Sequence, residues 1–209
     1  MAKPLLYDYW RSSASYRVRI ALNLKGVDHD VVAVNLLDGE QKAADYRARN
    51  PQGFVPTLEV GDLRLVQSLA IIGWLEARHP EPRLLPADPA DAAHVRAMAL
   101  TVACDIHPLN NLRVLRRLSA LGLSEAARDE WYRHWIAEGF AALEAMAAQA
   151  LTSRPRRSSS RTWRWRRTTS SRSSPSTIRT PVWAAMLSSV ACHGCQIALR
   201  YLEAEPGRR

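Results

Sequence analysis

The sequence predicts an α/β domain followed by an all-α domain, and three features lead to this fold class. Strand-like and helix-like segments alternate from Leu5 to Leu75, which is typical of a layered α/β fold. A proline-rich stretch from His79 to Pro89 then marks a boundary. Beyond it, apolar residues recur at helical spacing as far as Leu151. We therefore expect one domain at residues 1–83 and a second, helical domain at 84–209.

The first two elements are a strand and a helix that follows it directly. Apolar residues from Leu5 to Tyr9 suit a buried strand, and the pattern from Ser15 to Leu22, closed by Gly26, indicates an amphipathic helix. Ser12 and Ser13 therefore lie at a helix N-terminus, where free N–H groups and a partial positive charge hold anions. Serine is also a favoured N-cap, so a purely structural cap stays open here.

Four further elements complete the predicted α/β domain before its last helix. Pro56 has no backbone N–H, so it must lie at a sheet edge, at a bulge or after a cis bond. The expected elements are a strand at Asp28 to Asn35, a short helix at Glu40 to Arg49, a turn at Asn50 to Gly53, and a hairpin of Val55 to Val60 with Leu63 to Val66.

The last helix of the first domain repeats the arrangement of the first. Gln67 to Leu75 follows a strand at once, with Ser68 in the cap position and an apolar face beyond it. The order strand, helix, strand, helix, strand, strand, helix predicts a fold of three layers. An ordinary cap at Ser68 and an ordinary edge turn at Val55 and Pro56 are the structural alternatives.

The second half reads as two long helical segments, Ala90 to Leu118 and Ser124 to Leu151. Pro108 falls inside the first segment, and proline in a helix interior costs about 3 kcal/mol and bends the helix. His107, Asn110, Asn111 and Arg113 gather around this bend. From the residues alone, a polar surface kink explains them as well as a binding site does.

The charge is distributed very unevenly along the chain. The net charge is +9, which alone suggests nucleic acid as a partner. Residues 1–153 hold 17 Lys and Arg against 18 Asp and Glu, whereas residues 154–209 hold 12 Arg, no Lys and 2 Glu. The basicity therefore belongs to the tail. No apolar run reaches the ~18 residues of a membrane span, and Cys192 and Cys195 have only the spacing of a redox pair.

Residues 154–182 are atypical in composition. Arg154 to Ser160 and Thr162 to Thr169 are rich in arginine, serine and threonine, with almost no aliphatic residue. With GC-rich codons, Arg161 to Arg172 read one base earlier gives Asp, Leu or Val, Ala, Leu or Val, Ala, which suits an apolar helix. We interpret the segment as a frame error or a disordered stretch; a genuine nucleic-acid-binding tail of interleaved Trp and Arg is the alternative.

Four separated motifs together resemble one family, the zeta-class glutathione transferases, which are maleylacetoacetate and maleylpyruvate isomerases. The resemblance is close over residues 1 to about 118. It implies a thioredoxin-like domain followed by an all-helical domain. Ala14 and Arg113 depart from the animal members, which carry a cysteine and a small hydroxyl residue there. The motifs are Ser12 to Leu22, Asn50-Pro51, Val55-Pro56-Thr57 and Gln67 to Ile71.

The resemblance implies roles for individual residues. Ser12 would stabilise the glutathione thiolate and Ser13 would support it, while Arg11 beside them is our candidate for a substrate carboxylate. A structural ion pair is the alternative for Arg17 and, more strongly, for Arg19. The residues expected to bind glutathione or line its cleft are Ser15, Arg17, Gln41, Val55, Pro56, Gln67, Ser68, His107, Asn111, Leu112 and Arg113.

The implied function is glutathione-dependent cis-trans isomerisation of maleylacetoacetate or maleylpyruvate. The thiolate would add reversibly to the cis double bond of a small dicarboxylate substrate. The alternative is a general glutathione transferase or dehalogenase. The resemblance further implies a homodimer. Because the sequence has no apolar run of membrane length and no signal-peptide pattern at its N-terminus, we expect a cytoplasmic protein without membrane association, and we expect no metal and no nucleic-acid partner.

Overall fold

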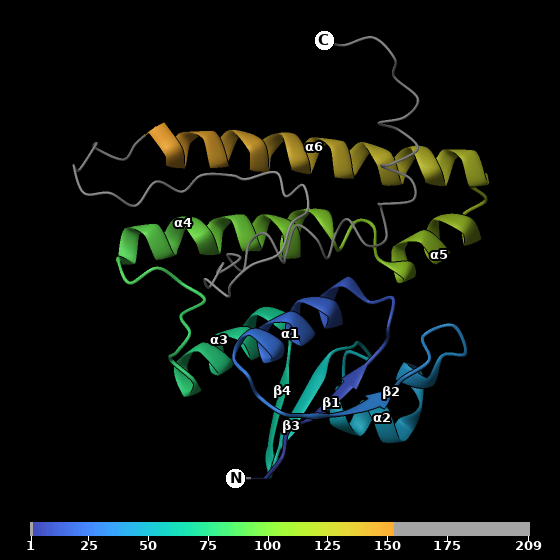
Figure 1. The fold of residues 1–209 in the computed structure, drawn as a ribbon. Helices are drawn as coiled ribbons and strands as arrows, with labels where there is room; N and C mark the ends of the chain where they lie inside the picture. Colours follow the sequence, from blue (N-terminus) through green and yellow to red (C-terminus); the bar gives the residue numbers. More distant parts are fainter. Residues whose placement is uncertain (1, 153–209) are drawn as a thin grey trace, which may run out of the picture.

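The computed structural model describes residues 2–152, which form a four-stranded sheet covered by helices and then a set of helices alone (Figure 1). The elements alternate between strand and helix as far as α3. In chain order they are β1 (Leu5–Asp8), α1 (Ser13–Leu24), β2 (Asp30–Ala33), the 3-10 helix η1 (Glu40–Lys42), α2 (Ala44–Arg49), β3 (Thr57–Val60), β4 (Leu63–Val66), α3 (Ser68–Arg78), α4 (Pro89–Leu100), the π-helix η2 (Thr101–Ile106), α5 (Leu112–Ala120) and α6 (Glu125–Thr152).

The sheet is mixed, with the strand order β2-β1-β3-β4. β1 and β2 are parallel, with Leu6 opposite Val31, and α1 makes the crossover between them. β3 runs antiparallel to both β1 and β4, and Leu58 pairs with Leu6 and Leu65. The β3–β4 connection is a tight hairpin at Gly61, whose φ is +59°.

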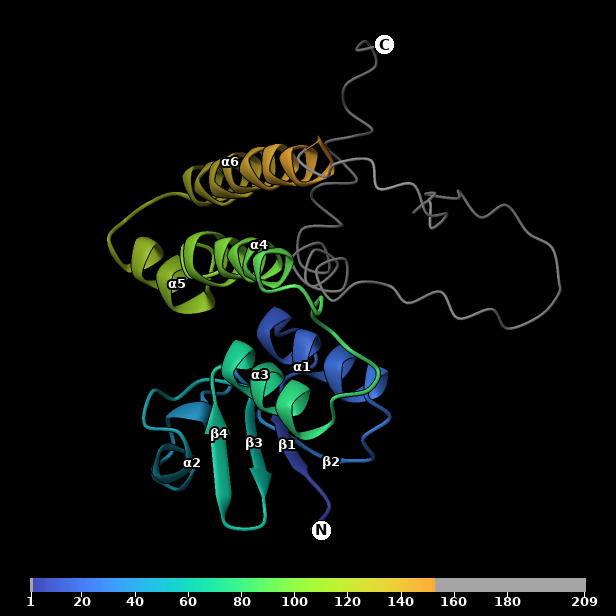
Figure 2. The ribbon, with the colours of Figure 1, turned by 90° about the vertical axis from the view of Figure 1, so that its left-hand side faces the viewer.

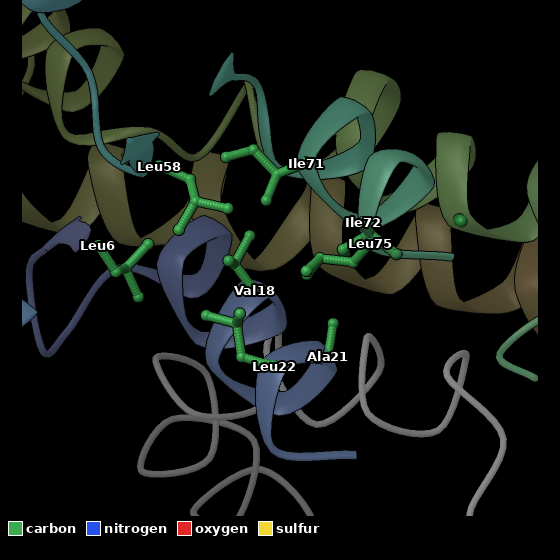
Figure 3. Packing of buried hydrophobic residues seen from close by; sticks show 9 residues of the cluster. Leu6, Val18, Ala21, Leu22, Leu58, Ile71, Ile72 and Leu75 are labelled. Carbon is green, nitrogen blue, oxygen red and sulfur yellow. The ribbon is translucent and has the colours of Figure 1, made fainter. Parts of the chain in front are cut away.

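The core on one face of the sheet joins the strands to α1 and α3 (Figure 3). Leu6 and Leu58 point from the sheet into this core, where they meet Val18 from α1 and Ile71 from α3. All four side chains are fully buried. On the opposite face, Tyr46 of α2 packs with alternating strand residues such as Tyr7, so the domain has three layers.

A buried lysine ties the ends of α1 and α3 together. Lys25 Nζ pairs with Glu76 and donates to the carbonyls of His79 and Pro82. The Glu76 carboxylate also accepts from the backbone N–H groups of Leu84 and Leu85. This network fixes the segment that leads out of the α/β layers.

The helical part lies against the α1 and α3 layer. α4 begins at an Asp88 N-cap that accepts from two backbone N–H groups. It lies between α6 and the α1–α3 layer in both views (Figures 1 and 2). Ala99 of α4 joins the first core, while Val102, Ile106 and Leu143 form a separate one with α6.

The structure corrects three of the predicted element boundaries. The segment Ala90 to Leu118 is not one bent helix, because the helical path ends at Ile106 and α5 begins only at Leu112. Pro108 cannot donate a backbone hydrogen bond, so the ladder stops there. The helix expected at Glu40 to Arg49 is divided into η1 and α2, and β3 begins after Pro56.

Within residues 2–152, no helix is long and apolar enough to cross a membrane, and no cluster of side chains suits a metal ion. The predictions for residues 154–182 and for Cys192 and Cys195 fall outside the described part of the chain.

Candidate active site

The site begins at the N-terminus of α1. Ser12 is the N-cap, and its Oγ accepts from the Ser15 backbone N–H at 3.2 Å. The Ser12 N–H donates to the Tyr9 carbonyl, which fixes the turn between β1 and α1. A hydroxyl that caps as an acceptor still has its own hydrogen to donate. The Ser12 O–H is therefore available to a negatively charged group at the positive end of α1. Ser13, the first helical residue, is partly buried beside it.

Arg11 and Trp10 form the exposed rim of the same turn. The Arg11 guanidinium lies 5.5 Å from the centre of the Trp10 ring, within the range of a cation–π contact. Trp10 is 71% exposed, so the pair faces outward next to Ser12. A cation at this place can meet an anionic substrate as it approaches.

Arg17 connects the N-terminal half of α1 with the start of α3. Its Nε donates to Ser68 Oγ at 3.0 Å, and both side chains are buried. Burial lowers the pKa of Arg17 to about 10, against a smaller raising effect from Cys104. The guanidinium is thus charged at neutral pH, and its Nη1 has no hydrogen-bond partner among residues 2–152.

The start of α3 differs from the sequence prediction in one respect. Ser68 is the first residue of the helix, and Gln67 occupies the N-cap position without capping through its side chain. Gln67 has φ +69°, which L-residues adopt rarely and at a cost of about 1–3 kcal/mol. Its Nε2 donates to Gln52 Oε1 at 2.7 Å. Such strain is found where a binding site holds the backbone in an unusual conformation.

The loop before β3 supplies Val55 and Pro56. The peptide bond between them is cis, one of the three arrangements that the sequence allowed. Gln41 lies beside this loop, since a Cβ added to Gly53 would be 2.8 Å from the Gln41 carbonyl oxygen. The buried Gln41 Oε1 has no hydrogen-bond partner in the described range.

The turn between η2 and α5 brings Arg113 to the same loop. The Arg113 guanidinium lies 4.7 Å from the Phe54 ring centre. Asn111 is the N-cap of α5, and its Oδ1 accepts from the Arg113 N–H at 3.1 Å. His107 and Leu112 are partly buried in this turn.

The structure thus brings predicted site residues together in two groups, each held together by a contact between distant parts of the chain. Arg17 connects Ser12, Ser15 and the rest of α1 with Ser68, while Phe54 connects Arg113 with Val55. Sequence reasoning missed Gln52, Phe54 and the Arg17–Ser68 bond. The turn motif from Asn50 to Gly53 was a signal in the sequence that could have pointed to Gln52. A bond between residues far apart in the chain, such as that between Arg17 and Ser68, leaves no signal in the sequence.

Arg17 and Arg19, two residues apart on α1, have different partners. Arg19 pairs with Asp8 at 2.8 Å, so the structural ion pair considered for it is present. Arg17 has no carboxylate partner among residues 2–152. Six buried side-chain polar atoms of residues 2–152 have no hydrogen-bond partner, and three of them, Ser15 Oγ, Arg17 Nη1 and Gln41 Oε1, belong to predicted site residues. These three fit a peptide-like anion that brings its own donors and acceptors.

Comparison with known proteins agrees with this arrangement. The profile of the glutathione S-transferase N-terminal domain matches residues 6–83. A maleylacetoacetate isomerase from Rhizobium meliloti (strain 1021) is 54% identical over 143 residues, which cover 68% of this chain and 67% of the relative. The sequence match therefore extends well beyond the α/β layers.

Two solved structures share the fold. The holo structure of a maleylpyruvate isomerase, a bacterial glutathione S-transferase in the zeta class, has a TM-score of 0.76 and 40% identity, and the match covers 93% of this chain and 84% of that one. A maleylacetoacetate isomerase from Methylobacterium extorquens AM1, with bound malonate and glutathione, has a TM-score of 0.71 and 34% identity over 93% and 83% of the two chains. The predicted glutathione transferase fold is confirmed, and the chain belongs to the zeta class of the glutathione S-transferase family.

Proposed function

We propose that the protein is a glutathione-dependent cis-trans isomerase of maleylacetoacetate or maleylpyruvate. The observation that carries this proposal is Ser12, whose hydroxyl caps α1 as an acceptor and keeps its hydrogen for an anion. The similarity of the chain to a maleylacetoacetate isomerase and to a maleylpyruvate isomerase also supports this proposal. Nothing in the comparisons supports a nucleic-acid-binding function.

The residues of this chain fit glutathione. Glutathione carries two carboxylates, a thiol and a peptide backbone, and each requires different partners. Ser68 and the first N–H groups of α3 would take one carboxylate, with the buried Arg17 charge behind them. The Val55 backbone would pair with the central peptide, and Gln41 and Gln67 would add amide contacts.

Ser12 and the α1 N-terminus would prepare the thiol. When bound, glutathione supplies a thiolate that adds reversibly to the cis double bond, so that the bond can rotate before elimination releases the trans product. A free thiol has a pKa of about 8.5, and a helix N-terminus lowers it. The Ser12 O–H adds a hydrogen bond to the charged form, which lowers the pKa further.

Arg11 and Arg113 are the candidates for holding the substrate carboxylates. Arg11 stacks on Trp10 next to the serines, and Arg113 stacks on Phe54 next to Val55. Both guanidinium groups are exposed, and no salt bridge of the described residues engages either of them. They can therefore bind a dicarboxylate without first breaking an internal ion pair.

Glutathione stoichiometry tests this function against its alternative. An isomerase returns glutathione unchanged, so thiol titration should show no loss during many turnovers of maleylpyruvate. A conjugating transferase would consume one glutathione per product, and a dehalogenase would release halide from a halogenated acid. Thiol loss equal to product formation would overturn the isomerase proposal and leave the family assignment intact.

We also propose the division into residues 1–83 and 84–209, a homodimer and a cytoplasmic location. The match of the N-terminal domain profile to residues 6–83 supports the boundary. Membership of the zeta class supports the homodimer. Size-exclusion chromatography with light scattering tests the homodimer, because a monomeric mass would contradict it.

A further inference from the structure

Two buried side chains converge on one carbonyl in the loop before β3. The Tyr46 hydroxyl donates to the Phe54 carbonyl oxygen at 2.7 Å, and Asn50 Nδ2 donates to the same oxygen at 2.8 Å. Tyr46 is 5% exposed and Asn50 is 1% exposed. A carbonyl oxygen has two lone pairs, so these two donors saturate it and hold it toward α2.

This arrangement fixes the orientation of the next N–H group. The Phe54–Val55 peptide is trans, since the cis peptides of the described residues are at Pro56 and Pro82. In a planar trans peptide, the C=O of one residue and the N–H of the next point in opposite directions. With the Phe54 oxygen held toward α2, the Val55 N–H must point away from α2. No backbone hydrogen bond within residues 2–152 uses that N–H.

The other polar atoms of the two side chains are also engaged by the protein. Asn50 Oδ1 accepts from the Gln52 N–H at 3.1 Å, and the Tyr46 hydroxyl lies 3.1 Å from Thr57 Oγ1. Neither side chain has a polar group left for a ligand. Any effect of Tyr46 and Asn50 on binding must therefore pass through the Phe54–Val55 peptide.

We propose that Tyr46 and Asn50 are positioning residues that set the plane of the Phe54–Val55 peptide and so present the Val55 N–H to the backbone of glutathione. This inference rests on the proposed function, in which Val55 pairs with the central peptide of glutathione. It separates two kinds of residue at the site: Ser12 and Ser68 meet the ligand, while Tyr46 and Asn50 hold the peptide that meets it.

Tyr46→Phe is the direct test, with Tyr7→Phe as its matched control. Both tyrosines are buried in the same cluster, with ring centres 5.9 Å apart. The Tyr7 hydroxyl donates to Glu59, not to the loop. Tyr7→Phe loses the bond to Glu59, and Tyr46→Phe loses the bonds to Phe54 and Thr57, so both should lower the melting temperature. Only Tyr46→Phe should weaken binding of S-methylglutathione, by about 3- to 10-fold, the net worth of one hydrogen bond.

Isothermal titration of the full chain with S-methylglutathione, well below the melting temperature, measures this effect. Asn50→Asp is the second variant, because it keeps the Oδ1 acceptor and removes the Nδ2 donor; it should weaken binding at least as much. Equal affinity of wild type, Tyr46→Phe and Asn50→Asp would overturn the inference while leaving the proposed function standing. If Tyr46→Phe and Tyr7→Phe weakened the binding of S-methylglutathione equally, Tyr46 would contribute only to stability, and the inference would also be overturned. Wild-type protein that binds no S-methylglutathione would overturn the proposed function itself.

Discussion

Arg17 Nε donates to Ser68 Oγ at 3.0 Å, and this bond joins the N-terminal halves of α1 and α3 inside the protein. A buried guanidinium without a carboxylate partner is expensive to desolvate. The Arg17 guanidinium lies beside the N-terminus of α3, and this placement is explained if a bound anion pairs with its charge. The acceptor bond also directs the Ser68 hydroxyl hydrogen away from Arg17, toward that anion.

Replacing Arg17 should therefore weaken glutathione binding more than it weakens folding. We expect Arg17→Met to raise the Kd for S-methylglutathione by about 10- to 100-fold, the range for a charged hydrogen bond. Calorimetric titration measures this. Lys25→Met is the matched control, since Lys25 is also a buried cation of α1 but pairs with Glu76. It should lower the melting temperature and leave the Kd unchanged; equal Kd values for wild type and Arg17→Met would contradict this role.

Removing the Ser12 hydroxyl should raise the pKa of the bound thiol. The donated hydrogen bond stabilises the thiolate, so its loss favours the protonated thiol. For a charged hydrogen bond, the expected rise in pKa is about 1–2 units in Ser12→Ala. Ultraviolet absorbance of the thiolate, followed as a function of pH with glutathione bound, gives this value. Ser12→Thr keeps the hydroxyl and should stay near wild type, and a shift of the same size in both variants would argue against the hydrogen bond.

Glu59 should make the stability of the α/β layers depend on pH. Burial alone would raise the pKa of Glu59, but hydrogen bonds from Arg64, Arg49 and Tyr7 outweigh it and hold the pKa below its ordinary value. The charged form therefore stabilises the fold above about pH 4.3, the pKa of an unfolded glutamate. This stability is lost as the pH falls through the lower folded pKa.

Glu59→Gln tests that dependence. At pH 7 it should lower the free energy of unfolding by about 1 kcal/mol, a modest value because Arg49 and Arg64 are partly exposed. Denaturant unfolding at pH 7 and near pH 3 measures the difference in the free energy of unfolding between wild type and Glu59→Gln. This difference should be smaller at the lower pH. A constant difference at both values would show that the charge of Glu59 is not involved.

A side chain at Gly53 should destabilise the fold more than one at Gly61. Its φ is +63°, and an added Cβ would lie 2.8 Å from the Gln41 carbonyl oxygen. Gly61 is the control, since its φ is +59° but nothing lies within 4 Å of an added Cβ. Both alanine variants bear the left-handed strain of about 1–2 kcal/mol, and only Gly53→Ala adds a clash worth about 1–3 kcal/mol. Thermal unfolding should rank wild type above Gly61→Ala and Gly61→Ala above Gly53→Ala; equal losses would disprove the clash.

Local patterns predicted most of the α/β layers, because strand alternation and helix caps are encoded in neighbouring residues. The turn at Gly53, the hairpin at Gly61 and the N-cap at Ser12 were all readable in this way. The end of the helical path at Ile106 was not, because the sequence shows that Pro108 interrupts a helix but not whether the helix bends or stops.

Long-range contacts were beyond the sequence. The bonds from Arg17 to Ser68 and from Tyr46 to Phe54 join residues whose nearness only the folded chain shows. The frame-error hypothesis for residues 154–182 stays a prediction, since these residues lie outside the described range. Resequencing the gene across Ser153 to Thr180 decides it, because an unshifted frame would leave a genuine arginine-rich tail.

The most direct measurement is the ultraviolet decay of maleylpyruvate with purified protein, in the presence and absence of glutathione, alongside Ser12→Ala. We predict decay that requires glutathione and that falls by about 100-fold or more without the Ser12 hydroxyl, as for removal of one group that stabilises developing charge. Folded protein that binds glutathione and produces no decay would contradict the isomerase function. Decay that proceeds equally well without glutathione or without the Ser12 hydroxyl would contradict the role of the α1 N-terminus.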